Sequence, residues 1–378
     1  MNTRRMPVGR AGAWVAALVL SLCGGRVAAF TPGSNGSYGP MTITANTTLE
    51  VPPDGVFHCT TISVAGGVTL RFAPNPLNTP IFLLATGDVT ISGNIDITGA
   101  AASGAIPGVG GPGGFDGGFG GFGDSAPANR GGDGNGPGRG VNATQLNNAA
   151  HATAAGSNTN VYGNVLILPM IGGSGGAGSN GNPGAGGGGG GGALLIASAT
   201  RITVNGNIRA MGGFSGAGGS GSGGAVRLVA PTGGGNGSID VQGGSGAGTG
   251  RIRIDCTAWD AFRNLRLFGR STRGTRMFVF PVNPPSLHIV EAAGQTIAVG
   301  APSGVTVELP AGSPTTQTVR LRGQGFSGNV PVTLVVNPEH TASTTYNLVL
   351  NGSANPPEVA TTVTLPVGEP TRIEAWVR

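Results

Sequence analysis

Residues 81–99 read IFLLATGDVTISGNIDITG, and the same pattern returns twice further along the chain. Residues 193–213 read ALLIASATRITVNGNIRAMGG, and residues 225–244 read AVRLVAPTGGGNGSIDVQGG. Each copy has an apolar run, a short break, an alternation of apolar and polar residues, and then glycine. A partial fourth copy, GRIRID, follows at residues 250–255. A recurring strand-like unit predicts a parallel β-solenoid, in which each coil buries its apolar side chains against its neighbours.

Glycine is concentrated in the middle of the chain. Of the 75 glycines among 378 residues, 52 lie between residues 99 and 250. The glycine-rich excursions begin at equivalent points of the three repeats, and the first of them, residues 100–192, is by far the longest. Because equivalent corners of a solenoid lie in register, loops from one corner emerge on one face. We therefore expect a glycine-rich surface along one side.

Two interpretations of this glycine differ in physical character. Glycine and serine disfavour any fixed conformation, which favours a flexible linker. Chains without Cβ atoms can also pack closely through their main-chain groups. GGSGGAG at residues 172–178 and PGAGGGGGGG at residues 183–192 resemble the polyglycine II segments of some bacterial and phage surface proteins. The sequence leaves both interpretations open, while the apolar residues 164–171, NVLILPMI, are expected to pack back on the coils.

Residues 1–29 have the pattern of a signal peptide. Three arginines precede an apolar run at residues 13–22, which is too short to span a membrane. Small residues then match a cleavage site after Ala29. Twin-arginine and lipoprotein signals fit less completely. We expect export to the cell surface or extracellular space, with the periplasm as an alternative.

Export changes the charge balance of the chain. Four of the 21 arginines lie in the removed segment, which leaves 17 against 16 acidic residues. The mature chain therefore gives little support to a nucleic-acid partner, and it has no second stretch suited to a membrane span. Cys59 and Cys256 lie at opposite ends of the predicted stack. Coils spaced by about 4.8 Å would hold them farther apart than the roughly 7 Å that a disulfide allows, so we expect free thiols.

The carboxyl-terminal part has a different pattern. Residues 259–268, WDAFRNLRLF, have apolar residues at a spacing of three, which favours a short capping helix, although a further strand also fits. Residues 286–378 hold seven or eight alternating runs, which predict an antiparallel β-sandwich of immunoglobulin-like type. The predicted organisation is a signal peptide at 1–29, the solenoid at 30–280 with its glycine-rich insert at 100–192, a linker at 281–285 and the sandwich at 286–378.

The acidic residues do not predict a catalytic or metal site. Asp96, Arg209 and Asp240 occupy equivalent positions of the repeats, which predicts an outward ladder of alternating charges. Polysaccharide-cleaving β-helix enzymes need paired carboxylates instead. Asp116 in GGPGGFD lies one position late for the Ca²⁺-binding nonapeptide, which is not repeated. No histidine pairs with another ligand at metal-binding spacing, so no catalytic residue, metal or cofactor is predicted.

Arginines gather near the end of the predicted stack. Seven arginines lie there with only Asp255 and Asp260 nearby: Arg251, Arg253, Arg263, Arg266, Arg270, Arg273 and Arg276. Arg263, Arg266, Arg270 and Arg273 are the candidate patch. Such a patch suits an anionic polysaccharide or phosphate. The alternative is a solvated end surface that discourages pairing of the last strands with other chains.

Several segments together resemble a family. They are NTPIFLLATGDVTISGNIDITG, GGPGGFDGG, GGGGGGGALLIASATRITVNGNI, SGGAVRLVAP and the carboxyl-terminal PPSLHIVEAAG to EAWVR. This combination resembles a group of functionally uncharacterised, secreted, glycine-rich bacterial β-helix-like proteins with a carboxyl-terminal immunoglobulin-like domain. The group transfers no activity or catalytic residue. We expect a non-enzymatic, adhesive or structural protein of the cell surface or extracellular matrix. A carbohydrate-active β-helix enzyme (lyase or hydrolase) and a non-catalytic glycan-binding module are the alternatives.

Overall fold

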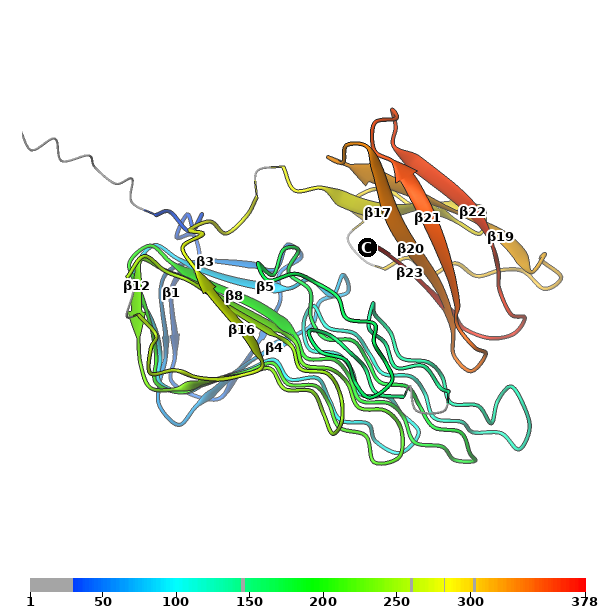
Figure 1. Ribbon diagram of the computed structural model, residues 1–378, viewed down its shortest axis with the longest axis horizontal. Helices are drawn as coiled ribbons and strands as arrows, with labels where there is room; N and C mark the ends of the chain where they lie inside the picture. Colours follow the sequence, from blue (N-terminus) through cyan, green and yellow to red (C-terminus); the bar gives the residue numbers. More distant parts are fainter. Residues whose placement is uncertain (1–29, 144–146, 259–260, 282, 302–303) are drawn as a thin grey trace, which may run out of the picture.

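The computed structural model describes residues 30–143, 147–258, 261–281, 283–301 and 304–378, and these ranges contain β-strands but no α-helix (Figure 1). Two large sheets are parallel, and two small antiparallel sheets follow in the carboxyl-terminal part. The predicted all-β class is confirmed, while the predicted signal peptide lies outside the described residues.

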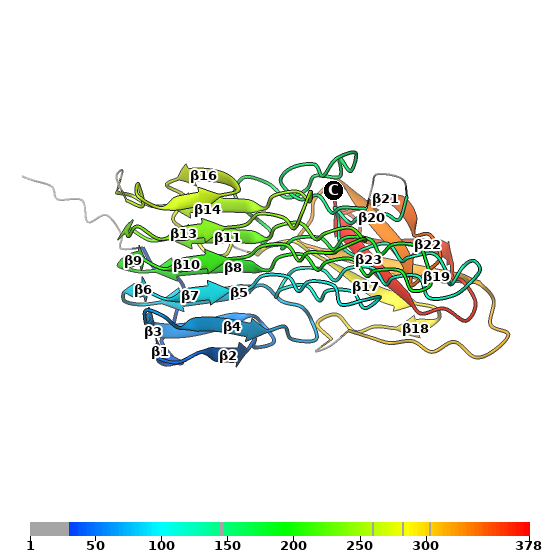
Figure 2. The ribbon, with the colours of Figure 1, turned by 90° about the horizontal axis from the view of Figure 1, so that it is seen from below.

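The two parallel sheets are built from successive coils of the chain, which Figure 2 shows stacked in order from β2 to β16. The ten-stranded sheet has the order β12-β9-β6-β3-β5-β8-β11-β14-β16, with β1 beside β3. Its strands are β1 (Gly39–Ile43), β3 (Val56–Val64), β5 (Ile81–Ala85), β6 (Val89–Ile91), β8 (Ala193–Ser198), β9 (Arg201–Val204), β11 (Ala225–Val229), β12 (Thr232–Gly234), β14 (Arg251–Asp255) and β16 (Arg270–Gly274). The six-stranded sheet, in spatial order, contains β15 (Arg266–Phe268), β13 (Ser238–Asp240), β10 (Asn207–Arg209), β7 (Asn94–Asp96), β4 (Thr69–Ala73) and β2 (Thr47–Glu50).

The three sequence repeats lie side by side and in register. β5 pairs with β8, and β8 with β11, all parallel. The later strands of the repeats stack in the same way, β6 on β9 and β7 on β10 on β13. The stacking predicted from the repeats is therefore confirmed. Cys59 in β3 and Cys256 just after β14 are both free thiols, as expected from the coils between them.

β8 is buried at all six positions because both of its faces are covered. Leu194 and Ile196 belong to the core inside the coils. Leu195 points outward and belongs to a second cluster with Ile167 and Met170. The expected return of the NVLILPMI segment onto the coils is therefore confirmed, and it explains why this strand is a continuous apolar run.

The corner before β10 explains why glycine and asparagine recur in the repeats. A Cβ atom on Gly206 would lie 1.7 Å from the carbonyl oxygen of Gly93 in the preceding coil, so only glycine lets these corners stack. The next residue of each coil joins a side-chain ladder. Nδ2 of Asn207 donates to Oδ1 of Asn94 at 2.8 Å, and Oγ of Ser238 donates to Oδ1 of Asn207 at 2.6 Å.

Turn residues close the last coil. Phe262 is buried with a φ of +61°, and a Cβ atom on Gly233 would lie 2.0 Å from its ring. Ala261 and Leu265 complete this cover over the core. The capping helix expected near this point is wrong for the described residues from 261 onward, where turns lead into β15. The buried ring of Phe262 covers the end of the core, so that a few turn residues are sufficient and a longer helical segment is not required.

The small antiparallel sheets share one core. One is β18 (Gln295–Thr296), β17 (Ser286–Ala292), β19 (Thr316–Gln324) and β22 (Glu358–Thr364) in spatial order, and the other is β21 (Thr344–Asn351), β20 (Asn329–Pro338) and β23 (Thr371–Val377). Val319 and Leu321 of the first sheet cluster with Val332 and Leu334 of the second.

Candidate functional site

The glycine-rich segments form an ordered bundle beside the coils (Figure 1). Residues 187–192 lie at its centre, and their amide N–H groups donate in turn to three neighbouring segments at 2.8–3.0 Å. These neighbours are residues 115–118, 219–222 and 97–100. Successive amides contact the three segments in rotation, so that every third amide donates to the same segment. A threefold repeat without internal hydrogen bonds is the geometry of the polyproline II type of helix. The central segment is therefore a polyglycine II helix.

The carbonyl groups of the same segment are also satisfied. They accept N–H groups from residues 108–111, residues 173–176, Gly213 and Ala225, again in threefold rotation. Neighbouring segments are bonded to one another as well, since the amide of Gly117 donates to Gly108 at 3.0 Å and that of Gly221 to Gly213 at 2.9 Å. Close packing of glycine chains, one of the two interpretations of the sequence, is confirmed for these residues. The buried backbone leaves no polar group unpaired in this segment.

Close approach is what requires glycine here. A Cβ atom would lie 2.0 Å from the carbonyl oxygen of Gly176 if placed on Gly187, and 1.9 Å from that of Gly173 if placed on Gly190. Neither glycine has a positive φ. At these two positions the bundle therefore excludes a side chain by its volume, and not because the backbone conformation requires glycine.

The carboxyl-terminal domain packs on the outer part of the bundle through buried polar contacts. The carboxylate of Asp133 accepts hydrogen bonds at 2.6 Å from Arg130 and from the hydroxyl of Ser343. Arg139 donates to the same hydroxyl at 3.0 Å. Burial alone would raise the pKa of Asp133, but the hydrogen bond from Ser343 and the charge of Arg130 hold it below its ordinary value.

Sheet β21-β20-β23 supplies further contacts to the bundle. Asn337 of β20 donates from Nδ2 to the carbonyl oxygen of Gly134 at 3.0 Å. The backbone amide of Gly136 donates to Glu374 of β23 at 3.0 Å. Burial raises the pKa of this carboxyl group. The bundle therefore contacts these sheets through its main chain as well as through its side chains.

A buried histidine and a partly buried tyrosine lie between the bundle and the last coils. The His151 ring stacks on Tyr162 with centroids 4.4 Å apart, and its Nδ1 lies 2.7 Å from the carbonyl oxygen of Gly223. Tyr162 donates to the carbonyl oxygen of Gly172 at 2.7 Å. Burial lowers the pKa of His151 to about 4, and the charge of Arg251 acts in the same direction. Sequence analysis missed this role of His151, because the only local signal is Tyr162, eleven residues further along the chain.

The structure brings the four candidate arginines onto the last coil. Arg263 lies in the closing turn, Arg266 in β15, and Arg270 and Arg273 in β16, and all four are exposed. None of them forms an ion pair with a carboxylate in the part of the chain that the structure describes. Arg273 donates to the carbonyl oxygen of Phe262 at 3.2 Å. Their role in anion binding stays a prediction.

The column of acidic and basic residues on the coils has the predicted register. Arg209 lies directly between Asp96 and Asp240 on neighbouring strands. The ion pair, however, is formed by Asp96 with Arg71 of the preceding coil at 3.2 Å, and the expected pairing through Arg209 is wrong. The acids of the glycine-rich insert have separate partners, as when Asp116 accepts the amide of Gly110. Within the described ranges, no three His, Cys, Asp or Glu residues gather to hold a metal.

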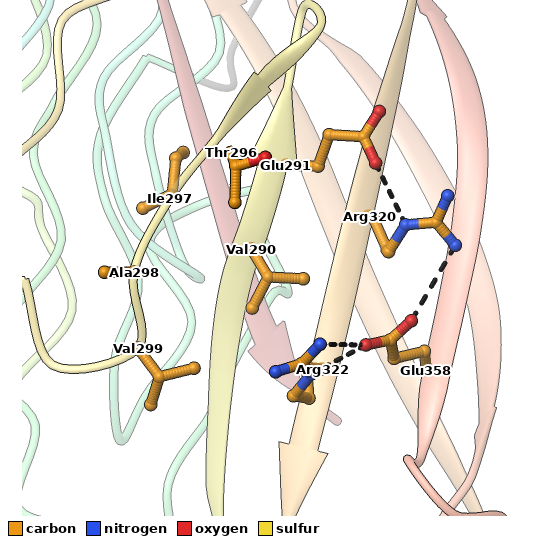
Figure 3. A pocket seen from close by; sticks show the side chains of 9 residues that line it. All are labelled: Val290, Glu291, Thr296, Ile297, Ala298, Val299, Arg320, Arg322 and Glu358. Carbon is orange, nitrogen blue, oxygen red and sulfur yellow. Dashed lines mark hydrogen bonds and ion pairs between the residues drawn. The ribbon is translucent and has the colours of Figure 1, made fainter.

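A pocket of about 370 Å³ lies on the carboxyl-terminal domain and contains a network of charges (Figure 3). Arg320 donates to Glu291 at 3.0 Å, Arg322 donates to Glu358 at 2.6 Å, and Arg320 also lies 3.7 Å from Glu358. The four residues come from β17, β19 and β22, where they lie opposite one another. Because two cations meet two anions, the pocket presents no uncompensated charge. The arginines two apart in one strand are the signal from which the sequence could have indicated this network.

Among the residues described, no helix is long and apolar enough to cross a membrane. No family model matches the chain, and no curated protein or solved structure matches it either.

Proposed function

We propose that the chain is an exported β-solenoid with a carboxyl-terminal immunoglobulin-like β-sandwich, and that it acts as a non-enzymatic, adhesive or structural protein of the cell surface or extracellular matrix. The in-register stack of repeats supports the solenoid, and two antiparallel sheets around one core support the sandwich. The glycine bundle is the observation that carries the function. It is an ordered body made almost entirely of backbone, attached to one side of the coils.

The surface of the bundle is suited to contact. Ile106, Val109 and Phe214 are 65%, 57% and 54% exposed. Their segments are neighbours, because the amide of Ala100 donates to Val109 and that of Ala102 to Phe214. Exposed apolar side chains that gather on one surface mark interaction sites. Since the supporting backbone is already ordered, binding through it loses little conformational entropy.

The carboxylates on the coils give less support to an enzyme. Asp96 and Asp240 lie two strand spacings apart, with Arg209 between them. That separation is about 10 Å, longer than the roughly 5–9.5 Å between the carboxyl groups of glycoside hydrolases.

Adhesion of the mature chain, residues 30–378, tests this function. Wild-type protein would be applied to apolar and polysaccharide-coated surfaces, and the protein retained after washing would be measured. We expect the triple variant Ile106→Ser, Val109→Ser, Phe214→Ser to lose at least about tenfold in retention on at least one surface. A double variant in the carboxyl-terminal domain, Val349→Ser with Val367→Ser, removes side chains that are 57% and 83% exposed and should keep wild-type retention.

Two results would contradict the proposal. Equal losses in the triple and double variants would show that adhesion is general stickiness of exposed apolar residues. New reducing ends or unsaturated products, after incubation of the wild-type protein with acidic polysaccharides, would show that it is an enzyme.

A further inference from the structure

A second pocket, of about 280 Å³, lies at the end of the stack, where β14 and β16 meet the chain that returns from the bundle. Its lining includes Ala152, Val165, Arg251, Arg270, Ser271 and Thr272. The pocket is separate from the apolar surface of the bundle proposed above, and its lining contains two cations but no acidic residue.

The two arginines are direct neighbours across the sheet. Arg251 of β14 is in register with Arg270 of β16. Like charges opposite one another on adjacent strands are destabilising. The nearest acid on these strands, Asp255, is already shared by Arg227 at 3.0 Å and Arg253 at 2.7 Å. In the described part of the chain, neither pocket arginine has a carboxylate within 4 Å, so the pocket holds uncompensated positive charge.

Their donors are positioned for a ligand. Nε and Nη2 of Arg251 both donate to the carbonyl oxygen of Tyr162, at 3.1 and 2.6 Å. These two hydrogen bonds fix the orientation of the guanidinium group, and Nη1 is left to donate to a ligand. The side chain of Arg270 has no hydrogen-bond acceptor among the described residues, and it is exposed. Thr272 donates to Val165 at 3.0 Å and ties the two walls together, while Ser271 adds a further hydroxyl.

We propose that this pocket binds a small oxyanion, a carboxylate or sulfate group, which is either a free anion or the charged substituent of an acidic polysaccharide. An oxyanion between Arg251 and Arg270 accepts charge-assisted hydrogen bonds from both and removes their repulsion. The volume is near the lower limit for ligand pockets, which suits one charged group rather than a length of chain. This inference goes beyond the adhesive function and does not depend on the bundle.

Titration calorimetry on the intact mature protein tests the proposal, with sodium sulfate, galacturonate, trigalacturonate and neutral galactose at constant ionic strength. We expect saturable binding of at least one anion and none of galactose. Trigalacturonate binding more tightly than the statistical advantage of its three carboxylates over one would identify a polysaccharide as the source, and an advantage no larger than statistical would identify a free anion. Absence of saturable binding by all three anions would overturn the proposal.

Variants separate the pocket from the charge of the whole end coil. Arg270→Gln should weaken anion binding at least about tenfold. Arg266→Gln is the matched control, because Arg266 is equally exposed on the same coil but outside the pocket. Equal losses in the two variants would overturn the proposal in favour of diffuse charge. Since Arg270→Gln leaves Ile106, Val109 and Phe214 intact, its retention on apolar surfaces should stay at the wild-type level, which keeps this test distinct from that of adhesion.

Discussion

Single methyl groups decide whether the bundle can form. On Gly190, a Cβ atom would lie 1.9 Å from a carbonyl oxygen of the main chain, which no side-chain rotation relieves. We therefore expect Gly190→Ala to lower the free energy of unfolding by at least about 2 kcal/mol, because the segment around Gly173 must move away from residues 187–192. Urea denaturation of the two proteins measures this loss.

A matched control exists in the same bundle. Gly216 is exposed and has no positive φ, and in the part of the chain that the structure describes no heavy atom lies within 4 Å of where its Cβ would be. Gly216→Ala should be neutral or stabilise the protein by up to about 1 kcal/mol, since alanine narrows the unfolded ensemble. If both substitutions had the same effect, glycine would act in the bundle through backbone entropy and not through close packing.

His151 gives the protein a pH dependence with a defined sign. Its pKa is about 4 in the fold and about 6.5 in a free side chain. Its stabilising contribution is complete above pH 6.5. As the pH falls towards 4, the unfolded chain binds a proton that the folded chain does not, so the unfolding free energy drops by up to about 3 kcal/mol.

The substitution His151→Asn should remove this contribution. Urea midpoints at pH 7.5 and pH 4.5 should then differ less for the variant than for the wild type. His288→Asn is the control, because His288 lies half-buried in β17, far along the chain from the bundle. Identical pH responses of wild type and His151→Asn would show that another group dominates this interval.

At the scale of elements, the polyglycine II helix of residues 187–192 behaves as secondary structure although it carries no side chains. All six amides of residues 187–192 have acceptors within 3.0 Å. In a hydrogen-exchange experiment we expect these six amide protons to resist exchange with solvent for at least about an hour at pH 7. The amides of Gly104 and Gly216, which have no described acceptor, should exchange at the rate of a free peptide. Fast exchange throughout residues 187–192 would instead support the interpretation of this segment as a flexible linker.

The elements also show what a sequence pattern can predict. The repeats carry their own register, because apolar positions and the glycine corner recur together, and so β5, β8 and β11 could be aligned correctly. The bundle could only be offered as one of two possibilities, since glycine has no side-chain pattern to tell a neighbour from solvent. Phe262 closes the coil with a positive φ, which its tertiary packing imposes and which its local conformational preference would not predict.

The candidate site was predictable to a similar extent. The cluster of arginines indicated a basic end to the stack, and the structure places all four on the last coil. The pairing of Arg251 with Arg270 depends on the register of β16, whose sequence RSTRG does not follow the repeat. Likewise Asp96 meets Arg71 because β4 precedes the first clear repeat and still stacks in register. The repeat therefore predicts where the charged residues lie on the coils, but it does not predict the contacts that they make with residues outside the repeats.

For the whole molecule, the bundle links the coils to the carboxyl-terminal domain. Asp133 is the centre of this contact, since it receives Arg130, the amide of Asn142 and both donors of Ser343. The contact contributes most above the ordinary pKa of an aspartate and is lost as the pH falls through the lower pKa of Asp133 in the fold. An exposed pair, Arg372 with Asp116, lies at the same interface with half of the arginine side chain in solvent.

Loss of the Asp133 contact should weaken the association of the bundle with the carboxyl-terminal sheets much more than loss of the exposed Arg372–Asp116 pair. Asp133→Ala leaves Arg130 without its anion and should cost about 3 kcal/mol, so that the carboxyl-terminal sheets separate from the bundle. Calorimetry should then resolve two unfolding transitions, and small-angle scattering at pH 7 should give a larger radius of gyration than for the wild type. Arg372→Ala should cost less than about 1 kcal/mol and leave both measurements unchanged. A compact Asp133→Ala variant with one transition would mean that the contacts of Asn337 and Glu374 are sufficient to hold the two parts together.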